Sequence, residues 1–388
     1  MKAATIYTLY GRRAGAELCF EKTLESMVRQ APDIAWTVLC NRESKPVVDG
    51  MALPGVATVQ IPDLDNQFRK AFWLEFRSPG FFRSRPQDVF WNPSGCNHFP
   101  GKWPFPAVTT FLDLGEYHVQ GKYDWKRTVF RKAICIPRSA RRSEAFTAIS
   151  RFTAEDAERI LHIGRVRPVL LGPSPHALPA VPKAWEVLAR ALGGEVPGRF
   201  WFVPGRTDFV GKGLDLILDA VGIDAERTGE TDAILFSGPE GVAHGAFMER
   251  MDRMDGGRGK LRYLGRVSEE VLSSLYRECF AVVLASRFEG FGFPVLEAMD
   301  AGAPVVCSDA GSLPEVAGDA ALLFSSGDAN ALAGCMARLR GEPGLRERLQ
   351  ECGRQRSRHF SWEACGREML EVLRAAADGE RGGKGART

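Results

Sequence analysis

The sequence lacks any long apolar run. Its first residues, MKAATIYTLYGRRAG, hold no apolar stretch of the length that a secretory signal peptide needs. No segment approaches the roughly 18 consecutive apolar residues of a membrane-spanning helix. We therefore expect a cytoplasmic protein without a transmembrane segment.

A large excess of one charge is also missing. The chain holds 51 Lys and Arg against 48 Asp and Glu, a net charge of +3, and its isoelectric point is near 8.4. Nucleic-acid-binding domains are usually far more basic. No nucleic-acid partner is expected.

Patterns that hold metals or activate nucleophiles are absent. Nine cysteines are scattered without a CxxC pair, so we expect reduced thiols in a reducing compartment. Six histidines show no i,i+4 pairing and no grouping with cysteine. There is no G-x-S-x-G nucleophile elbow. Asp63-Leu64-Asp65 lies in a polar stretch and is interpreted as an ordinary loop. No metal and no cofactor are predicted.

The 388 residues exceed what one hydrophobic core usually holds, so two domains are expected. Short β-branched or aromatic runs alternate with helical segments, which predicts parallel sheets with helices on both faces. Strands are expected at 4–10, 35–40, 88–91, 107–114, 146–150, 199–205, 233–238, 261–265, 281–286, 304–309 and 321–324. The segment 172–184 has four prolines in thirteen residues and is predicted to be a linker between domains 1–175 and 185–360.

The most informative segment is ASRFEGFGFPVLEAMDAGAPVVCSDAGSLPEV, residues 285–316, which starts at the end of an expected strand. Seven residues separate Glu289 from Glu297, and a glycine-rich turn lies between them. Backbone N–H groups at such a turn, with the dipole of the following helix, form an anion site suited to phosphate. The two carboxylates can accept hydrogen bonds from sugar and ribose hydroxyls.

This E-x7-E pattern, followed by LEAMDAGAPVV and a G-x-LPE-V turn, resembles the retaining GT-B glycosyltransferases of the group 1 or family 4 class. The resemblance implies an α/β fold of two Rossmann-like domains facing a central cleft, the first for the acceptor and the second for the donor. It implies that Glu289 faces the donor sugar and that Glu297 holds the ribose. The backbone would line the sugar and diphosphate at Gly290, Phe291, Gly292 and Phe293.

Arg206 and Lys212 precede an amphipathic helix, and the resemblance implies that they neutralise the leaving diphosphate. A P-loop is excluded here. Five residues, not four, separate Gly205 from Gly211, and Gly213 replaces the Ser or Thr that would bind Mg²⁺.

Other parts of the chain share the resemblance. Gly265 and Val267 would lie beside the nucleotide base, and Gly15 would approach the donor phosphate and the acceptor. A helix at about 361–376 would cross back onto the acceptor domain.

One departure concerns the end of the expected strand 107–114. Many relatives carry His-Asp where this chain has Leu112 and Asp113. Either the donor sugar lacks the hydroxyl that the histidine would contact, as in a deoxysugar, or His118 reaches the sugar from the same loop. A surface role for His118 is a third possibility.

Two basic segments could contact a membrane. Residues 126–142 hold seven basic residues and no acidic one, and residues 68–85 interleave aromatics with Arg and Lys. We expect peripheral, salt-sensitive membrane association through a set of five cations: Arg131, Lys132, Arg138, Arg141 and Arg142.

The sequence therefore predicts a metal-independent, retaining hexosyltransferase that uses a nucleotide-diphosphate sugar. The acceptor would be a saccharide or lipid-linked saccharide in bacterial polysaccharide or lipopolysaccharide assembly. Two alternatives stay open: a GT-B sugar-nucleotide epimerase and a non-catalytic nucleotide-sugar-binding protein.

Overall fold

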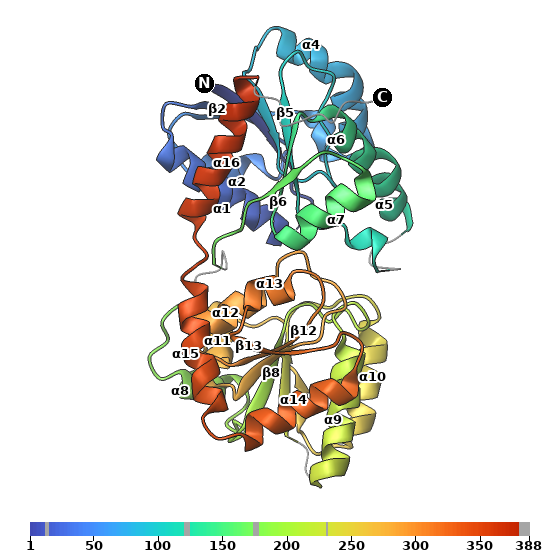
Figure 1. The fold of residues 1–388 in the computed structure, drawn as a ribbon, viewed down its shortest axis with the longest axis vertical. Helices are drawn as coiled ribbons and strands as arrows, with labels where there is room; N and C mark the ends of the chain where they lie inside the picture. The colour runs from blue at the N-terminus through green and yellow to red at the C-terminus, as the bar shows by residue number, and fades with distance from the viewer. Residues whose placement is uncertain (12–14, 120–124, 174–177, 230–231, 380–388) are drawn as a thin grey trace. The chain divides into compact units, whose positions relative to one another are not determined.

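The computed structural model describes residues 1–11, 15–119, 125–173, 178–229 and 232–379. The chain divides into two compact units. Unit 1 comprises Met1–Pro175 with Phe360–Thr388, and unit 2 comprises His176–His359. Each unit is a parallel sheet covered by helices (Figure 1).

The sheet of unit 1 has seven parallel strands in the order β3-β2-β1-β4-β5-β6-β7. Its strands are β1 (Lys2–Tyr7), β2 (Ala35–Cys40), β3 (Val56–Gln60), β4 (Val89–Asn92), β5 (Ala107–Phe111), β6 (Ala145–Ala148) and β7 (Val166–Pro168). The central strands are buried on both sides because helices cover both faces. The two edge strands, β3 and β7, are missing from the sequence prediction.

The helices of unit 1 are α1 (Gly15–Gln30), α2 (Lys45–Gly50), η1 (Pro62–Asp65), α3 (Gln67–Phe72), η2 (Trp73–Arg77), α4 (Ser78–Arg83), η3 (Gly115–Tyr117), α5 (Trp125–Val129), η4 (Phe130–Cys135), α6 (Ile136–Arg142), α7 (Arg151–Leu161) and α16 (Trp362–Ala377). The last of these, α16, packs along α1 although the two helices stand at opposite ends of the sequence (Figure 1). Ser26 Oγ donates to Trp362 O at 2.6 Å, and Trp362 Nε1 donates to Pro173 O at 3.0 Å. Glycine is required at Gly172, since a Cβ there would lie 2.5 Å from the Trp362 ring.

Two helices of unit 1 contain a π-helical turn in the middle. In η2 the N–H of Ser78 donates to Trp73 O, and after η4 the N–H of Ile136 donates to Arg131 O. Such turns are rare and often stand near functional sites. Each π-helical turn joins two short α-helices into one longer continuous helix, which we call a rod. The two rods are α3–η2–α4 and α5–η4–α6.

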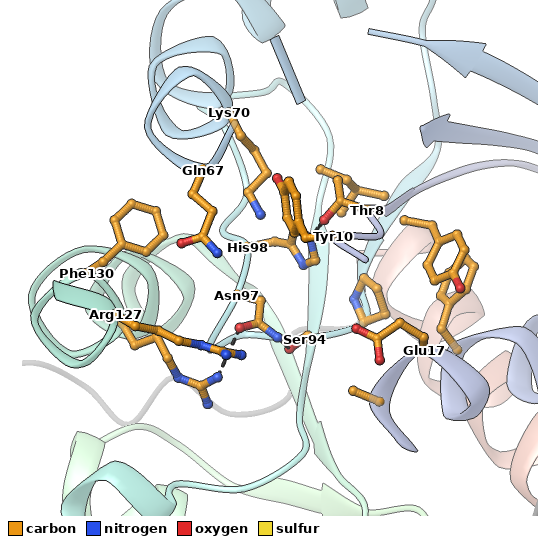
Figure 2. A pocket seen from close by; sticks show the side chains of 16 residues that line it. Thr8, Tyr10, Glu17, Gln67, Lys70, Ser94, Asn97, His98, Arg127 and Phe130 are labelled. Atoms are coloured by element: carbon orange, nitrogen blue, oxygen red, sulfur yellow. Dashed lines mark hydrogen bonds between the residues drawn. The ribbon is translucent and has the colours of Figure 1, made fainter. Parts of the chain in front are cut away.

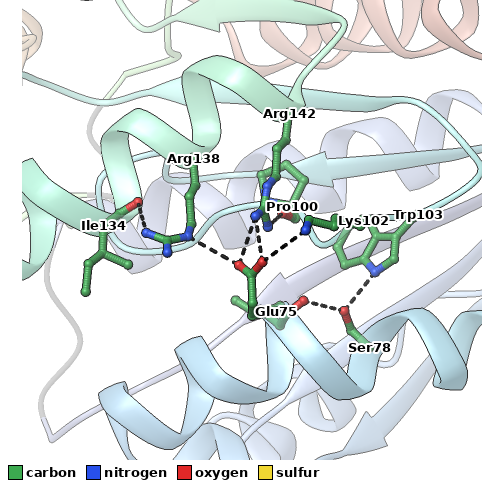
Figure 3. A network of polar contacts seen from close by, with 9 residues as sticks. Glu75, Ser78, Pro100, Lys102, Trp103, Ile134, Arg138 and Arg142 are labelled. Carbon is green, nitrogen blue, oxygen red and sulfur yellow. Dashed lines mark hydrogen bonds and ion pairs between the residues drawn. The ribbon is translucent and has the colours of Figure 1, made fainter.

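A network around Glu75 joins these two rods (Figure 3). The Glu75 carboxylate accepts from Arg142 Nη2 at 2.8 and 2.9 Å and from Arg138 Nε at 3.2 Å, and Lys102 Nζ lies 3.8 Å away. The hydrogen bond from Arg142 is the main cause that lowers the pKa of Glu75. The network fixes α6 against η2.

The sheet of unit 2 has six parallel strands in the order β10-β9-β8-β11-β12-β13. Its strands are β8 (Phe200–Pro204), β9 (Ala233–Ser237), β10 (Leu261–Tyr263), β11 (Ala281–Leu284), β12 (Val305–Ser308) and β13 (Ala321–Phe324). Its helices are α8 (Ala184–Ala191), α9 (Leu214–Thr228), α10 (His244–Asp255), α11 (Glu269–Glu278), α12 (Phe293–Ala301), α13 (Leu313–Ala317), α14 (Ala329–Gly341) and α15 (Leu345–Ser357). All six strands were predicted, each within two residues of its observed ends.

Within the described ranges, none of the helices has the length and apolar character needed to cross a bilayer. All nine cysteines lie in these ranges, and each is a free thiol.

Candidate functional site

Each sheet has a point where its strand order reverses, next to the first strand of the unit. In unit 1 that point lies between β1 and β4, and in unit 2 between β8 and β11. Ligands of open α/β sheets bind beyond the carboxyl ends of the strands at such points. The loops that follow β8 and β11 hold Arg206, Lys212 and Glu289, so the predicted donor residues stand where the topology favours a ligand.

Lys212 and Glu289 meet directly. The Lys212 Nζ lies 2.5 Å from Glu289 Oε1, and Ser286 Oγ donates to the same oxygen at 2.8 Å. The side chains of Lys212 and Glu289 are 34% and 16% exposed, so the pair is partly shielded from water. Ser286, which the sequence reasoning missed, stands three residues before Glu289 in the same loop.

Two glycines allow these loops to approach each other closely. A Cβ on Gly213 would lie 1.9 Å from Ala285 O, and Gly213 has φ +64°. A Cβ on Gly311 would lie 2.3 Å from Glu289 O, which also accepts the Ser312 N–H at 3.1 Å. The loop after β8 is therefore locked against the end of β11, and this contact sets the position of Lys212.

Arg206 has a more open position. Its side chain is 42% exposed, and Nη2 donates to the buried Asp208 carboxylate at 3.2 Å. The neighbouring Thr207 Oγ1 lies 2.8 Å from His244 Nδ1, which anchors the same loop to α10. Arg206 can therefore move toward a ligand while its loop stays fixed.

Glu297 lies in the second turn of α12 and is held by a buried tyrosine. Tyr276 Oη donates to Glu297 Oε2 at 2.5 Å. Burial raises the pKa of Tyr276 well above its ordinary value, so the phenol stays protonated and acts as the donor. The second carboxylate oxygen, Oε1, is on the same rigid group and can accept from a ligand hydroxyl.

The turn from Gly290 to Phe293 leads into α12, whose cap residue Gly292 has φ +101°. A Cβ on Gly292 would lie 2.8 Å from the Leu313 side chain, so no other residue fits without a shift. Backbone N–H groups at a helix start favour an anion. Gly302, with φ +80°, ends the helix, as predicted.

Gly265 and Val267 follow β10 in the same unit. Gly265 has φ +65°, and its carbonyl accepts from Gly238 N–H at 2.9 Å and from Ser237 Oγ at 3.0 Å. Val267 is half-buried just before the N-cap Ser268 of α11. A role beside a nucleotide base stays a prediction for both residues.

The remaining predicted residues belong to unit 1. Gly15 is exposed at the start of α1, and Leu112 lines a small apolar cavity between the strands β4 and β5 and the helices α1 and α16. Asp113 Oδ1 accepts from the Gly115 N–H at 2.8 Å. The His118 Nε2 lies 2.7 Å from Asp156 Oδ2 on α7, so its ring is held by a buried carboxylate. A sugar hydroxyl would have to share or replace that contact.

The sequence reasoning missed a cavity of about 230 Å³ in unit 1, at the point where the strand order reverses (Figure 2). Its walls are formed by the end of β1, the loops after β1 and β4, the start of α1, helix α3 and the segment α5–η4. Its polar lining consists of Thr8, Tyr10, Glu17, Gln67, Lys70, Ser94, Asn97, His98, Arg127 and Arg131. The only sequence signal was the placement of its residues after expected strands.

The predicted set of five membrane-binding cations is partly wrong. Arg131 is 5% exposed and pairs with Glu116, with Nε 2.8 Å from Oε1. Arg138 and Arg142 are held by Glu75. These acidic partners lie outside residues 126–142, so the local charge count could not reveal them.

The Asp63-Leu64-Asp65 segment forms the short helix η1, not a plain loop. The oxygens of Asp63 are bound by Arg69 at 2.9 Å and by Arg77 at 2.8 Å. Both carboxylate oxygens of Asp63 are therefore bound by arginines of unit 1.

Residues 198–356 match the family model for glycosyl transferases group 1. The chain is similar to this family over that region, which lies in unit 2. The predicted donor residues of unit 2, from Arg206 to Glu297, all lie within the matched region.

Solved structures show the fold of the whole chain. Sucrose-phosphate synthase from Thermosynechococcus elongatus superposes with a TM-score of 0.74 at 19% identity, covering 97% of this chain and 99% of that one. The Anabaena protein HepE in complex with UDP-glucose gives a TM-score of 0.69 at 16% identity, covering 97% and 100%. The chain therefore has the GT-B fold with two Rossmann-like units.

Among curated proteins, the O-antigen chain mannosyltransferase B of Escherichia coli is 40% identical over 116 residues, 30% of each chain. The chain spans less than half the length of the curated relatives that it matches.

Proposed function

We propose that this protein transfers a hexosyl unit from a nucleotide-diphosphate sugar to a saccharide hydroxyl, with retention of configuration. The observation that carries the proposal is the Lys212–Glu289 pair at the reversal point of the unit 2 sheet. It combines a cation for a diphosphate with a carboxylate for a sugar, beside the start of α12. The UDP-glucose bound to HepE supports a nucleotide-sugar donor for this fold.

In this proposal the leaving diphosphate develops negative charge that Lys212 and Arg206 stabilise. Glu289 and Ser286 orient the Lys212 ammonium, and Glu289 also faces the donor sugar. Glu297, oriented by Tyr276, accepts from the ribose hydroxyls. The donor phosphate oxygen takes the proton of the acceptor hydroxyl as the new glycosidic bond forms on the face that the diphosphate leaves. Unit 1 binds the acceptor.

No metal is required in this mechanism, since two side-chain cations already serve the diphosphate. We therefore expect transfer activity to survive EDTA at a concentration that removes all free Mg²⁺ and Mn²⁺. The measurement is the initial transfer rate before and after chelation. Complete loss that Mg²⁺ or Mn²⁺ restores would contradict the mechanism.

We further propose assembly of a bacterial cell-surface polysaccharide, which the likeness to an O-antigen mannosyltransferase supports. Peripheral membrane binding would use a different surface from the predicted cations. Five apolar side chains on α3–η2 and α5 are exposed, and we call them the aromatic face because four of them are aromatic: Phe68, Phe72, Phe76, Trp125 and Val129. Four exposed cations stand on the same helices: Arg69, Arg77, Lys126 and Arg127. Apolar rings flanked by cations suit an anionic lipid surface.

The deciding experiment has two steps. A thermal-shift screen of UDP-, GDP- and dTDP-sugars identifies the donor, because a ligand of the native state raises its stability by mass action. The donor is then incubated with saccharide acceptors, and the products are analysed by mass spectrometry and by NMR for the anomeric configuration. Donor conversion without an acceptor would favour the epimerase, and binding without turnover would favour the non-catalytic protein.

A further inference from the structure

The cavity of unit 1 contains a buried cation. Lys70 on α3 is 2% exposed, and its side chain points into the cavity (Figure 2). Among the described residues, no carboxylate forms an ion pair with it and no hydrogen bond to its Nζ is found. The Lys70 Nζ lies over the ring of Tyr10, 5.1 Å from the ring centroid.

Burial of such a charge is costly, and the titration of Lys70 reflects this. Burial is the main cause that lowers the pKa of Lys70 from 10.5 to about 8. The ammonium is therefore still mostly charged at neutral pH. Proteins rarely bury a cation without a partner. A missing partner in a cavity is best explained by a ligand that supplies it.

The other groups around the cavity add positive charge and hydrogen-bond donors. Arg127 lines it from α5, and Arg131 lines it from η4 while bound to Glu116 and to Asn97 Oδ1 at 3.0 Å. Glu17, the lining carboxylate, lies across the cavity from Arg127 in Figure 2. The wall near α3 and α5 is therefore the cationic one.

Two neutral groups complete this wall. Tyr10 Oη donates to Leu64 O at 2.7 Å, and burial raises its pKa to about 12, so it carries no charge. His98 is buried with one ring nitrogen 2.9 Å from Thr8 Oγ1, and burial and Lys70 lower its pKa well below the ordinary value. Its Nδ1 atom has no hydrogen-bond partner in the described parts of the chain. Two residues that line this cavity, Lys70 and His98, thus each have a polar atom without a hydrogen-bond partner among the described residues: Lys70 Nζ and His98 Nδ1.

We infer that this cavity binds an oxyanion of the acceptor, a phosphate or carboxylate group, through Lys70 and Arg127. The inference rests on the proposed function only in naming the ligand as an acceptor. A phosphate or carboxylate supplies the negative charge that Lys70 lacks and accepts hydrogen bonds from both cations. The acceptor hydroxyls then lie toward Ser94, Asn97 and Glu17, which can bind neutral sugar groups.

The test measures binding to the full-length protein by isothermal titration calorimetry, without donor. The probes are glucose 6-phosphate, glucuronate and neutral glucose. We expect at least one anionic sugar to bind at least about tenfold more tightly than glucose, since one charge-assisted hydrogen bond contributes about that factor or more. Comparison of the Kd values of glucose 6-phosphate and glucuronate shows whether the cavity prefers a phosphate or a carboxylate.

Variants locate the binding. Lys70→Met should weaken the anion's Kd by at least about tenfold, and Arg127→Gln by at least about threefold. The matched control is Lys22→Met, which removes an exposed lysine of α1, and it should change Kd by less than about twofold. Lys212→Ala should retain anion binding, because Lys212 belongs to unit 2. If Lys70→Met does not fold, the Kd of the anion for Arg127→Gln tests the inference instead.

Equal affinity for glucose and the anions, or an unchanged Kd in both cavity variants, would overturn the inference. Loss of anion binding in Lys212→Ala would place the anion in unit 2 and also overturn it. Anion binding without transfer to any acceptor would leave the cavity site standing and remove the proposed function. Transfer to neutral acceptors without anion binding would leave the proposed function standing and remove the cavity site.

Discussion

Lys212 is the residue on which the proposed donor chemistry depends most. Its ammonium is held by Glu289 and is thus positioned before any ligand arrives. We expect Lys212→Ala to lower kcat by about 10- to 100-fold with a smaller change in donor affinity, because charge on the diphosphate grows in the transition state. Steady-state kinetics with the identified donor measure both quantities.

The matched control removes an exposed lysine of the same unit. Lys183→Ala deletes a side chain that is 73% exposed and paired with Glu186, so kcat should stay within about twofold of wild type. A fall in donor affinity with unchanged kcat in Lys212→Ala would show that this lysine only binds the ground state.

We expect Lys70 to lower the free energy of unfolding of the wild-type protein, as residues retained for binding often do. Its folded pKa of about 8 lies below its ordinary 10.5, so the charged form disfavours the native state. The difference corresponds to roughly 3 kcal/mol. We expect Lys70→Met to raise the free energy of unfolding at pH 7 by up to about this amount. Urea unfolding followed by tryptophan fluorescence measures it.

The pH dependence gives a second check with a definite sign. Between about pH 8 and 10.5 the wild-type native state loses the Lys70 proton while the unfolded chain keeps it, so wild-type stability rises in that window. The advantage of Lys70→Met should therefore shrink there. A variant less stable than wild type at pH 7 would contradict this reading of the buried ammonium.

At the scale of elements, the start of α9 depends on one glycine. Gly213 is the N-cap of α9, and a Cβ there would overlap Ala285 O at the end of β11. We expect Gly213→Ala to destabilise unit 2 by about 2 kcal/mol or more, from the positive φ and the forced shift. The same shift should displace Lys212 and reduce transfer. Denaturant unfolding and kinetics on one preparation test both effects.

Gly222 provides the control inside the same helix. A Cβ there would meet only the Met254 side chain, at an ordinary 3.8 Å. Gly222→Ala should therefore stabilise α9 by about 0.5–1 kcal/mol. Similar stability for both alanine variants would mean that the loop after β8 is not fixed by its contact with β11.

Most of the strands that the sequence predicted well are buried on both faces. The central strands of both sheets are continuous apolar runs bounded by glycine or polar residues, so their pattern does not depend on distant contacts. The edge strands β3 and β7 were missed: β3 is half-exposed along its length, and β7 is three residues long and includes Arg167 and Pro168. The E-x7-E segment was recognised because its residues are consecutive in one loop and helix.

What the sequence could not provide is the set of contacts made across long separations. On α3–η2 the aromatic residues Phe68 and Phe76 are 66% and 68% exposed while Lys70 between them is buried, and the interleaved pattern of residues 68–85 does not show which of them face solvent. The side that a short helix buries is decided by the surrounding structure, and a π-helical turn shifts the pattern further. The unit 1 cavity joins residues from five segments, so no local motif could reveal it.

At the scale of the whole molecule, the aromatic face should control membrane partitioning. We expect the protein to float with vesicles containing phosphatidylglycerol at low salt and to be released in part at 1 M salt. Phe68→Ser with Phe76→Ser should reduce vesicle binding by at least about tenfold, because each ring loses the gain of leaving water. Flotation followed by quantitative gel analysis measures the bound fraction.

A double variant in unit 2 controls for exposed apolar residues in general. Trp185→Ser with Val242→Ser removes two side chains that are 42% and 48% exposed. Vesicle binding should be unchanged in this variant. If the wild-type protein stays in solution at low salt, the aromatic face has another role.

The packing of α16 on α1 has a consequence for the order of synthesis. Unit 2 is one continuous stretch, His176–His359, whereas unit 1 needs Phe360 and the residues after it. A ribosome that makes the chain from its N-terminus therefore releases all of unit 2 before unit 1 can be completed. The face of α1 that holds Thr23 and Ser26 stays uncovered until Trp362 and Cys365 emerge. Unit 1, whose first 175 residues are translated before unit 2, can therefore complete its fold only after unit 2 has been synthesised. The docking of α16 on α1 is the step that completes it.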